Sequence, residues 1–346
     1  MKNFKLPILS ELLQREEEFF SKCFMMSYSG LNKLMFSPKL FYMHYILNQR
    51  DDTTDKHAIE GKLIHCLFLN PDDFDKEFVL MATDFPSDNP KQVLDRLYVH
   101  YSELKSQGDP RSELEHFQHA ILDILKDMNL YQSLKTDQQR IDKIIIEKHK
   151  SYWQYLQNSE NKINVDQATY DYAKEIVEQL KNNDTILELM GFVNPEFGMD
   201  VQVFNEIELA GFPEGLPFGI RGFIDNLVID NTNKVIRVND LKKTSKDIMS
   251  FRESINYYNY WIQAAMYYKL VEQVYLLKPE YKDYDFEFRF IVVDNYTQVA
   301  PIKVSKETLK EWIDKTDDCI NQACYHFDNK NFDLPYELLI NKEIVI

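Results

Sequence analysis

The spacing of apolar positions predicts helices in the first part of the chain. Over residues 8–48 the pattern is helical, with interruptions at 27–30 and at 37–38. Ser29 is a candidate cap for a helix that begins near Leu31. A second amphipathic helix is predicted over 55–69, where Asn70 and Pro71 end it.

Further along the chain the period changes. Residues 86–190 are highly charged and predict mostly helix, whereas the segment from 196 to 241 has the pattern of strands. A long helix is predicted at about 252–276, followed by the strands 285–294 and 298–305 and a final helix near 306–327. This order predicts an α/β core with a helical elaboration.

The segment 221–241 predicts a β-hairpin, because two apolar runs flank the turn-forming residues 230–233. A turn centred there places Asp225 opposite Asp240, with Cβ atoms about 4.5–5.5 Å apart. Two carboxylates at that separation can share one hard divalent cation. Lys242 lies two residues after Asp240 and so returns to the same face of the strand. Two acids and one amine on one face suit the cutting of a phosphodiester.

The same residues could be ordinary surface charges, which contribute little to stability when they pair in solvent. The apolar flanks of both strands favour burial, and buried charges are rarely left without a partner.

Composition limits how the chain could meet a nucleic acid. The 346 residues are 44% hydrophobic and 14% aromatic, as in a folded globular protein with a substantial core, and carry a formal net charge of −16. This charge argues against a broad basic surface and against a nuclease. Any contact with DNA would need a local groove of Lys and Arg, with a metal ion offsetting the carboxylates of the site.

The compartment expected from the sequence is a reducing cytoplasm. The first residues lack a secretory signal, and no apolar run reaches the roughly 18–20 residues that span a bilayer. The four cysteines have no disulfide-scaffold spacing. An iron–sulfur cluster is not expected, since Cys319 and Cys324 are five apart on a predicted helix and no C-x-x-C is present.

Three further residues are candidates on helices. His65 follows Gly61 by one turn on an apolar helix and could be a metal ligand, although a lone histidine there also fits a core position. Gln263 and Tyr267 share one helix face and could orient a carboxylate or contact a phosphate. An ordinary packing helix with one buried tyrosine would have the same pattern.

Any of three acidic residues that precede the hairpin could complete a metal site: Glu196, Glu206 and Glu208. Glu196 is preferred, because the residues after it can form the adjoining strand.

Taken in order, these motifs resemble those of the PD-(D/E)XK nuclease superfamily. They are Gly61-x-x-x-His65, Asp225, Asp240-Leu241-Lys242 and Gln263-x-x-x-Tyr267. Within it, the chain resembles the RecB/RecE-type exonucleases. Residues 26–42 are similar to the Ser-x-Ser-x-Leu…Ser-Pro opening of RecE-like proteins, and residues 65–78 to their His-x-Leu-Leu-x-Pro-x-x-Phe segment. The resemblance runs from about residue 26 to the C-terminal helix, and residues 86–160 are its least typical part.

The resemblance implies a restriction-endonuclease-like fold, with a mixed central sheet flanked by helices and a large N-terminal or inserted helical region. Residues 1–85 would carry the Gly-x-x-x-His motif and pack on the nuclease core. Residues 86–190 would form a mostly helical insertion, and residues 191–346 the core itself.

The resemblance also implies roles for the site residues. The ligands of a catalytic Mg²⁺ or Mn²⁺ would be His65, Asp225, Asp240 and the backbone carbonyl of Leu241. Lys242 would hold or activate the attacking water and stabilise the phosphorane. Gln263 and Tyr267 would support the site and contact the DNA backbone, and Arg221 could meet a phosphate. Two positions depart from the pattern: Lys243 stands where many relatives have Thr or Ser, and no proline precedes Asp225.

The function implied is that of a metal-dependent DNA exonuclease of phage or prophage recombination or DNA end processing, in a bacterial or phage-infected cytoplasm. It could form a ring-like homo-oligomer and have a single-strand annealing protein as its partner. The alternatives are a structure-specific or end-trimming endonuclease on the same site, and a catalytically inactive DNA-binding or scaffold relative.

Overall fold

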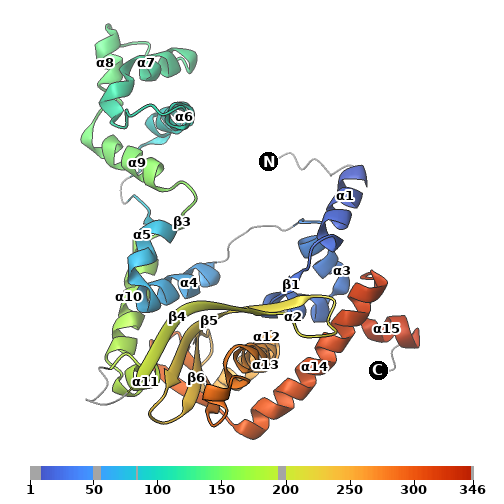
Figure 1. Ribbon diagram of the computed structural model, residues 1–346. Coiled ribbons are helices and arrows are strands. Elements are labelled where there is room, and N and C mark those ends of the chain that lie inside the picture. The colour runs from blue at the N-terminus through green and yellow to red at the C-terminus, as the bar shows by residue number, and fades with distance from the viewer. Residues whose placement is uncertain (1–8, 50–55, 83–84, 194–199, 344–346) are drawn as a thin grey trace. The chain divides into compact units, whose positions relative to one another are not determined.

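The computed structural model describes residues 9–49, 56–82, 85–193 and 200–343 of the chain (Figure 1). The chain divides into two compact units. The first consists of residues 1–55 together with 175–346, and the second of residues 56–174. The boundary between them falls inside helix α10 (Gln167–Lys181).

A mixed sheet of six strands forms the centre of the first unit. Its strands are β1 (Met25–Met26), β4 (Val201–Gly211), β5 (Gly219–Asp230), β6 (Val235–Lys243), β7 (Asp285–Val293) and β8 (Val299–Val304). The pairs β4–β5, β5–β6 and β7–β8 are antiparallel, whereas β1–β5 and β6–β7 are parallel. This is the mixed α/β core that the sequence predicts.

The predicted hairpin is present with the predicted register. In the β5–β6 ladder Asp230 pairs with Val235, and the ladder continues to Asn226 and Asn239. Asp225 and Asp240 are the next residues on the two strands, so the register places them opposite each other.

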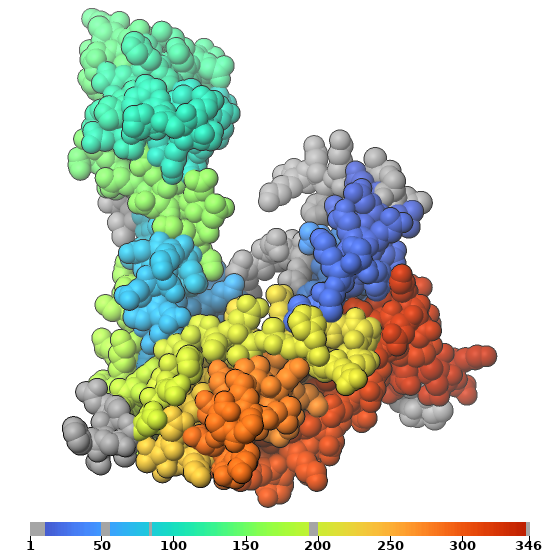
Figure 2. All heavy atoms as spheres, in the orientation of Figure 1, coloured from blue at the N-terminus to red at the C-terminus, as the bar shows by residue number. Residues whose placement is uncertain are grey.

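The first unit also contains helices. They are α1 (Leu9–Phe20), α2 (Tyr28–Phe36), α3 (Pro38–Phe41), α11 (Asp184–Leu189), α12 (Phe251–Tyr258), α13 (Tyr260–Val271), α14 (Lys306–Asn329) and α15 (Tyr336–Asn341), with short turns η1 (Tyr42–Ile46), η4 (Ile248–Ser250), η5 (Glu272–Leu276) and η6 (Pro279–Tyr281). Helix α13 lies against β5 with α14 beside it (Figure 1). In the space-filling view the strands β4 and β5 border the orange surface of α13 and η5 (Figure 2). The apolar core includes Ile262 and Met266 from α13 and Phe288 and Phe290 from β7.

The second unit is mostly helical. Its elements are α4 (Lys56–Leu69), η2 (Pro71–Asp73), α5 (Phe74–Glu77), β2 (Phe78–Leu80), α6 (Asp88–Ser106), η3 (Leu114–Phe117), α7 (Gln118–Asp127), α8 (Asp137–Ile141), α9 (Glu147–Asn158), β3 (Ile163–Val165) and the first part of α10. Strands β2 and β3 pair in parallel. Leu97, Tyr101, Phe117 and Trp153 belong to a separate apolar core.

Two local predictions are wrong. The N-cap of α2 is Ser27 and not Ser29, because the Ser27 hydroxyl accepts the backbone N–H of Gly30 at 3.2 Å. The long helix expected at about 252–276 is broken, since Asn259 adopts the left-handed conformation with φ 54° and separates α12 from α13. Asparagine tolerates this conformation better than most residues.

The described residues contain no helix that is long and apolar enough to cross a membrane.

A network of charges on β7 gives the fold an expected sensitivity to acid. Glu287 lies 2.5 Å from Lys303 Nζ and 2.7 Å from Arg289 Nη2. Burial raises the pKa of Glu287, but the bonds from Lys303 and Arg289 more than offset this effect and lower the pKa from 4.5 to about 2. A carboxyl whose pKa falls on folding stabilises the fold above its unfolded pKa, and that contribution is lost as the pH falls toward 2.

We therefore expect Glu287→Gln to lower the free energy of unfolding by about 1–3 kcal/mol at pH 7. The difference from the wild-type chain should shrink between pH 4.5 and pH 2. Urea unfolding at several pH values measures it, and an equal pH dependence in both proteins would contradict the assigned role of Glu287.

Candidate active site

The sheet opens beside Asp225. Strand β4 pairs along one edge of β5, while β6 pairs only with Asn226–Asp230 and β1 only with Gly219 and Ile220. A strand has two edges, so β1 and β6 lie on the same edge of β5. Between them, residues 221–225 have no strand partner on that edge within the described part of the chain.

The alternation of β5 also shifts at this point. Ile220 and Ile224 are buried in the core, and so are Leu227 and Ile229, so the core-facing positions move by one residue across Asp225 and Asn226. On β4, Glu206 has a φ of 49°, and the β4–β5 ladder omits the Glu206–Asp225 pair. Such a φ is uncommon for a residue other than glycine, and strained positions of this kind cluster at functional sites.

This shift brings two carboxylates together. A carboxylate oxygen of Glu206 lies within 4.8 Å of one of Asp225. Of the three acids that precede the hairpin, Glu206 is therefore the one beside Asp225, whereas Glu208 lies two residues further along β4, opposite Phe223. Glu196, the preferred candidate, falls outside the described residues.

Asp225 bridges the opening between the strands. Its Oδ2 atom accepts the backbone N–H of Leu241 at 2.7 Å, where a ladder bond would otherwise form. In an antiparallel pair the N–H and C=O of one residue point to the same neighbour. The carbonyl of Leu241 therefore also faces β5 at the opening.

Asp240 is the centre of a buried network. Its side chain is fully buried, and Lys242 Nζ lies 2.5 Å from its Oδ2 atom. Gln263 Nε2 is 2.9 Å from Asp240 Oδ1 and 2.9 Å from the Tyr267 hydroxyl, which in turn donates to the carbonyl of Phe223. The structure thus joins Asp240, Lys242, Gln263 and Tyr267, which the sequence selected from two distant segments.

The charges of the network set the protonation of its members. Burial lowers the pKa of Lys242, but the charges of Asp240 and Asp225 outweigh it and the pKa is raised. Burial raises the pKa of Tyr267 well above its ordinary value, and the same two carboxylates raise it further. Lys242 is therefore a cation and Tyr267 a neutral hydroxyl at neutral pH.

Two buried asparagines hold the hairpin beside the site, and neither was selected from the sequence. Asn239 Nδ2 donates to Asn226 Oδ1 at 2.8 Å and to the carbonyl of Leu189 at 3.1 Å. Asn226 Nδ2 donates to the carbonyl of Met190 at 3.2 Å. These bonds fix the last pair of the ladder to the end of α11. In the sequence, the available signal for this role was the presence of two amide side chains within otherwise apolar strands.

Gly222 allows Tyr267 to approach the sheet. A Cβ atom at residue 222 would lie 2.7 Å from Tyr267 Cε1 and 3.1 Å from Leu270 Cδ1. Real Cβ atoms do not come so close to a ring, so Tyr267 would have to move.

We expect Gly222→Ala to displace Tyr267 and Gln263 and so to reduce, about 10- to 100-fold, the rate of the DNA hydrolysis that the sequence resemblance implies, in line with the cost of small misplacements near reacting groups. Gly215→Ala serves as the control, because a Cβ at residue 215 meets no described atom within 4 Å, so any loss there comes from its backbone φ of 82° and not from a displaced side chain. Initial rates on labelled DNA measure the effect, and full activity of Gly222→Ala would show that the position of Tyr267 is not needed.

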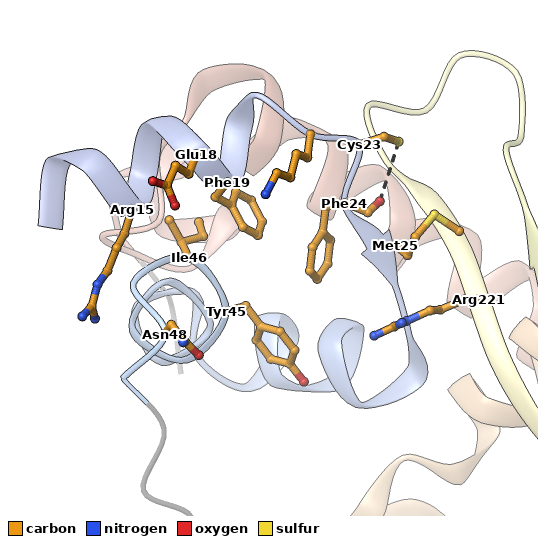
Figure 3. Close-up of a pocket in the computed structure, with 11 residues that line it drawn as sticks. Arg15, Glu18, Phe19, Cys23, Phe24, Met25, Tyr45, Ile46, Asn48 and Arg221 are labelled. Carbon is orange, nitrogen blue, oxygen red and sulfur yellow. Dashed lines mark hydrogen bonds between the residues drawn. The ribbon is translucent and has the colours of Figure 1, made fainter. Parts of the chain in front are cut away.

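The predicted site residues also include Arg221 and His65. Arg221 extends from β5 into a hollow of about 550 Å³ that Arg15 and Lys22 also line (Figure 3). His65 lies half-buried on α4, in the second unit.

The donor set of the first unit fits a hard divalent cation. It supplies carboxylate oxygens from Asp225, Asp240 and Glu206 and a backbone carbonyl, which are the ligands that Mg²⁺ and Mn²⁺ accept. Gln263 Oε1 is buried and has no hydrogen-bond partner among the described residues. Such an acceptor suits a water molecule bound at the site.

The family model of the PD-(D/E)XK nuclease superfamily matches residues 25–334. The chain belongs to this superfamily. In the nuclease, Asp240-Leu241-Lys242 has the Asp-x-Lys form of the motif that gives the superfamily its name, and membership supports nuclease activity.

No curated protein matches the nuclease significantly. Among solved structures, it is similar to a protein from Eubacterium rectale that is provisionally named an exonuclease. The two chains are 12% identical with a TM-score of 0.46, and the match covers 99% of the nuclease and 95% of the other chain. A likeness this weak does not bear on the activity.

Proposed function

We propose that the nuclease is a metal-dependent DNA exonuclease with Asp225, Asp240 and Lys242 at its centre. The observation that carries the proposal is the buried carboxylate of Asp240, held between Lys242 and Gln263 beside the sheet opening at Asp225. A buried ionic network at an opening of the sheet is costly as a structural device and useful as a reactive site.

The residues that would hold the ion are Asp225, Asp240 and the carbonyl of Leu241, with His65 as a nitrogen ligand. Glu206 would add a further carboxylate beside Asp225. When bound, Mg²⁺ or Mn²⁺ lowers the pKa of a coordinated water and offsets charge on the phosphate.

The other residues act on charge and position. Lys242, a cation, holds the attacking water and stabilises the negative charge that develops on the non-bridging oxygens. Gln263 and Tyr267 hold Asp240 in place, so its carboxylate loses little conformational entropy when it binds an ion.

Arg221 would contact a phosphate of the DNA backbone. It shares its hollow with Arg15, Lys22 and one acid, Glu18, so the lining carries a net positive charge in a chain with a net charge of −16 (Figure 3). Phosphate contacts position a strand without reading its sequence.

The finer assignment is to the RecB/RecE-type branch, with a role in phage or prophage recombination. The Ser-x-Ser-x-Leu opening at residues 27–31 and the His65 segment support it. A single-strand annealing protein would be the natural partner, and a ring-like homo-oligomer a natural assembly.

Incubation of the purified protein and Mg²⁺ with end-labelled linear DNA, and separately with internally labelled circular DNA, tests this function. An exonuclease degrades only the linear DNA, with short products from its ends. Cleavage of the circle would show an endonuclease, and two intact substrates would show a binding protein without activity.

A further inference from the structure

A column of tyrosine rings leads from Lys242 to the surface. Lys242 Nζ lies 5.1 Å from the ring centre of Tyr260. The ring of Tyr258 stacks on Tyr260 at 5.4 Å with an interplanar angle of 26°. Tyr257 then meets Tyr258 edge to face at 4.8 Å. The column therefore begins at the reactive amine and continues outward.

The outer two rings face solvent. Tyr257 is 79% exposed and Tyr258 is 49% exposed. The end of α12, which carries them, is anchored through its backbone, because the carbonyl of Tyr258 accepts bonds from the Tyr28 hydroxyl and from Asn32 Nδ2. The left-handed Asn259 separates these rings from the buried start of α13. The rings are thus held in place without being covered.

Exposed aromatic rings beside a phosphodiester-cutting site suit one occupant in particular. Every nucleobase has a flat π face, and stacking on an aromatic side chain contributes about 1–3 kcal/mol per base. In a duplex those faces are already covered, so only unpaired bases are available to such rings. The net charge of −16 also limits what electrostatic attraction can contribute to DNA affinity, which increases the weight of stacking.

We propose that Tyr257 and Tyr258 form a stacking platform for unpaired bases next to the scissile phosphodiester, so that the nuclease prefers single-stranded DNA or an unpaired end. This inference rests on the proposed function for the identity of the substrate. The platform is continuous with the proposed site through Tyr260 and Lys242.

Binding measured without hydrolysis tests the platform. The probe is a fluorescently labelled 12-nucleotide thymidine strand, and anisotropy gives its Kd with Ca²⁺ in place of Mg²⁺. We expect Tyr257→Ala and Tyr258→Ala each to raise this Kd about 5- to 100-fold. Tyr257→Phe and Tyr258→Phe keep the rings and should bind like the wild-type chain.

Two controls separate stacking from a general loss of binding. Tyr336→Ala removes a partly exposed tyrosine from α15, the helix that follows α14. Helix α14 contacts α13 where Asp317 pairs with Lys269, and it ends at Asn329, about 18 Å further along its axis. Tyr336 is therefore a control remote from α13. This substitution should leave the Kd unchanged. A strand of the same length with abasic nucleotides keeps its phosphates but has no bases to stack. The wild-type chain should therefore bind it weakly, and the alanine variants should bind it with the same Kd as the wild-type chain.

Each outcome decides a separate point. An unchanged Kd in both alanine variants, an equal loss for the base-bearing and abasic strands, or no binding of the thymidine strand by the wild-type chain would overturn the platform. If the wild-type chain cuts DNA and the platform fails, the nuclease assignment stands. If the binding results hold but no DNA is cut, the proposed activity is wrong, and the two tyrosines form a binding site for unpaired bases without a cleavage site beside it.

Discussion

Asp240→Asn is expected to reduce metal-dependent hydrolysis of linear DNA by about a thousandfold or more. Asparagine keeps the volume of Asp240 and can still bond to Gln263, but it has no charge to offer to a cation or to Lys242. The initial rate of release from end-labelled DNA measures the effect.

Asp283→Asn is the matched control, because Asp283 is an exposed carboxylate whose nearest cation, Lys234, is 3.9 Å away. Its rate should equal that of the wild-type chain. Thermal unfolding of both variants separates lost chemistry from lost folding. A folded Asp240→Asn variant that keeps full activity would end the assignment of this site.

Lys242→Met is expected to lower the rate of the chemical step at least about 100-fold while the affinity for Mn²⁺ changes little. Methionine fills the space of the lysine stem but removes the cation beside Asp240. A rise in affinity also agrees with this role, since the ammonium group competes for the same carboxylate at 2.5 Å. Single-turnover rates and calorimetric titration with Mn²⁺ measure the two quantities separately.

The next residue on the strand gives the control. Lys243 ends β6 and lies on the opposite face of the strand from Asp240 and Lys242, where its ammonium group bonds to Asn295 at 3.1 Å. Lys243→Met should therefore retain most of the activity. Equal losses of rate and of Mn²⁺ affinity in Lys242→Met would place Lys242 among the groups that shape the metal site.

The register of the hairpin could be predicted because it depends on local chemistry. The polar residues 230–233 fix the turn, and the period of a strand then determines which residues face each other across it. The pair Asp225 and Asp240 follows from that rule alone. The family membership could also be predicted, because the motifs occur together in the family's order, although each motif alone is weak evidence.

The opening of the sheet was not predicted, although a trace of it is present in the sequence. Apolar residues occupy 220 and 224 and then 227 and 229, so their parity changes beside Asp225. A prediction that assumes regular alternation along both strands of the hairpin overlooks this shift. The left-handed Glu206 could not be foreseen, because its conformation depends on β4 and β5 together and not on its own neighbours.

The break at Asn259 shows a similar limit. The apolar spacing of 252–276 continues across it, so the period predicts one helix. The carbonyl of Tyr258 accepts bonds from Tyr28 and Asn32, and the Asn259 amide donates to Asn32. These bonds stabilise the break, and both partners lie more than 200 residues earlier in the chain. Contacts so distant in sequence leave no local pattern.

The most direct test of the account is a crystal of the full chain soaked in Mn²⁺ and measured for anomalous scattering. The account predicts a peak within about 2.5 Å of a carboxylate oxygen of both Asp225 and Asp240, with the Leu241 carbonyl as a further ligand. A chain saturated with Mn²⁺ whose ion lies away from both Asp225 and Asp240 would contradict it.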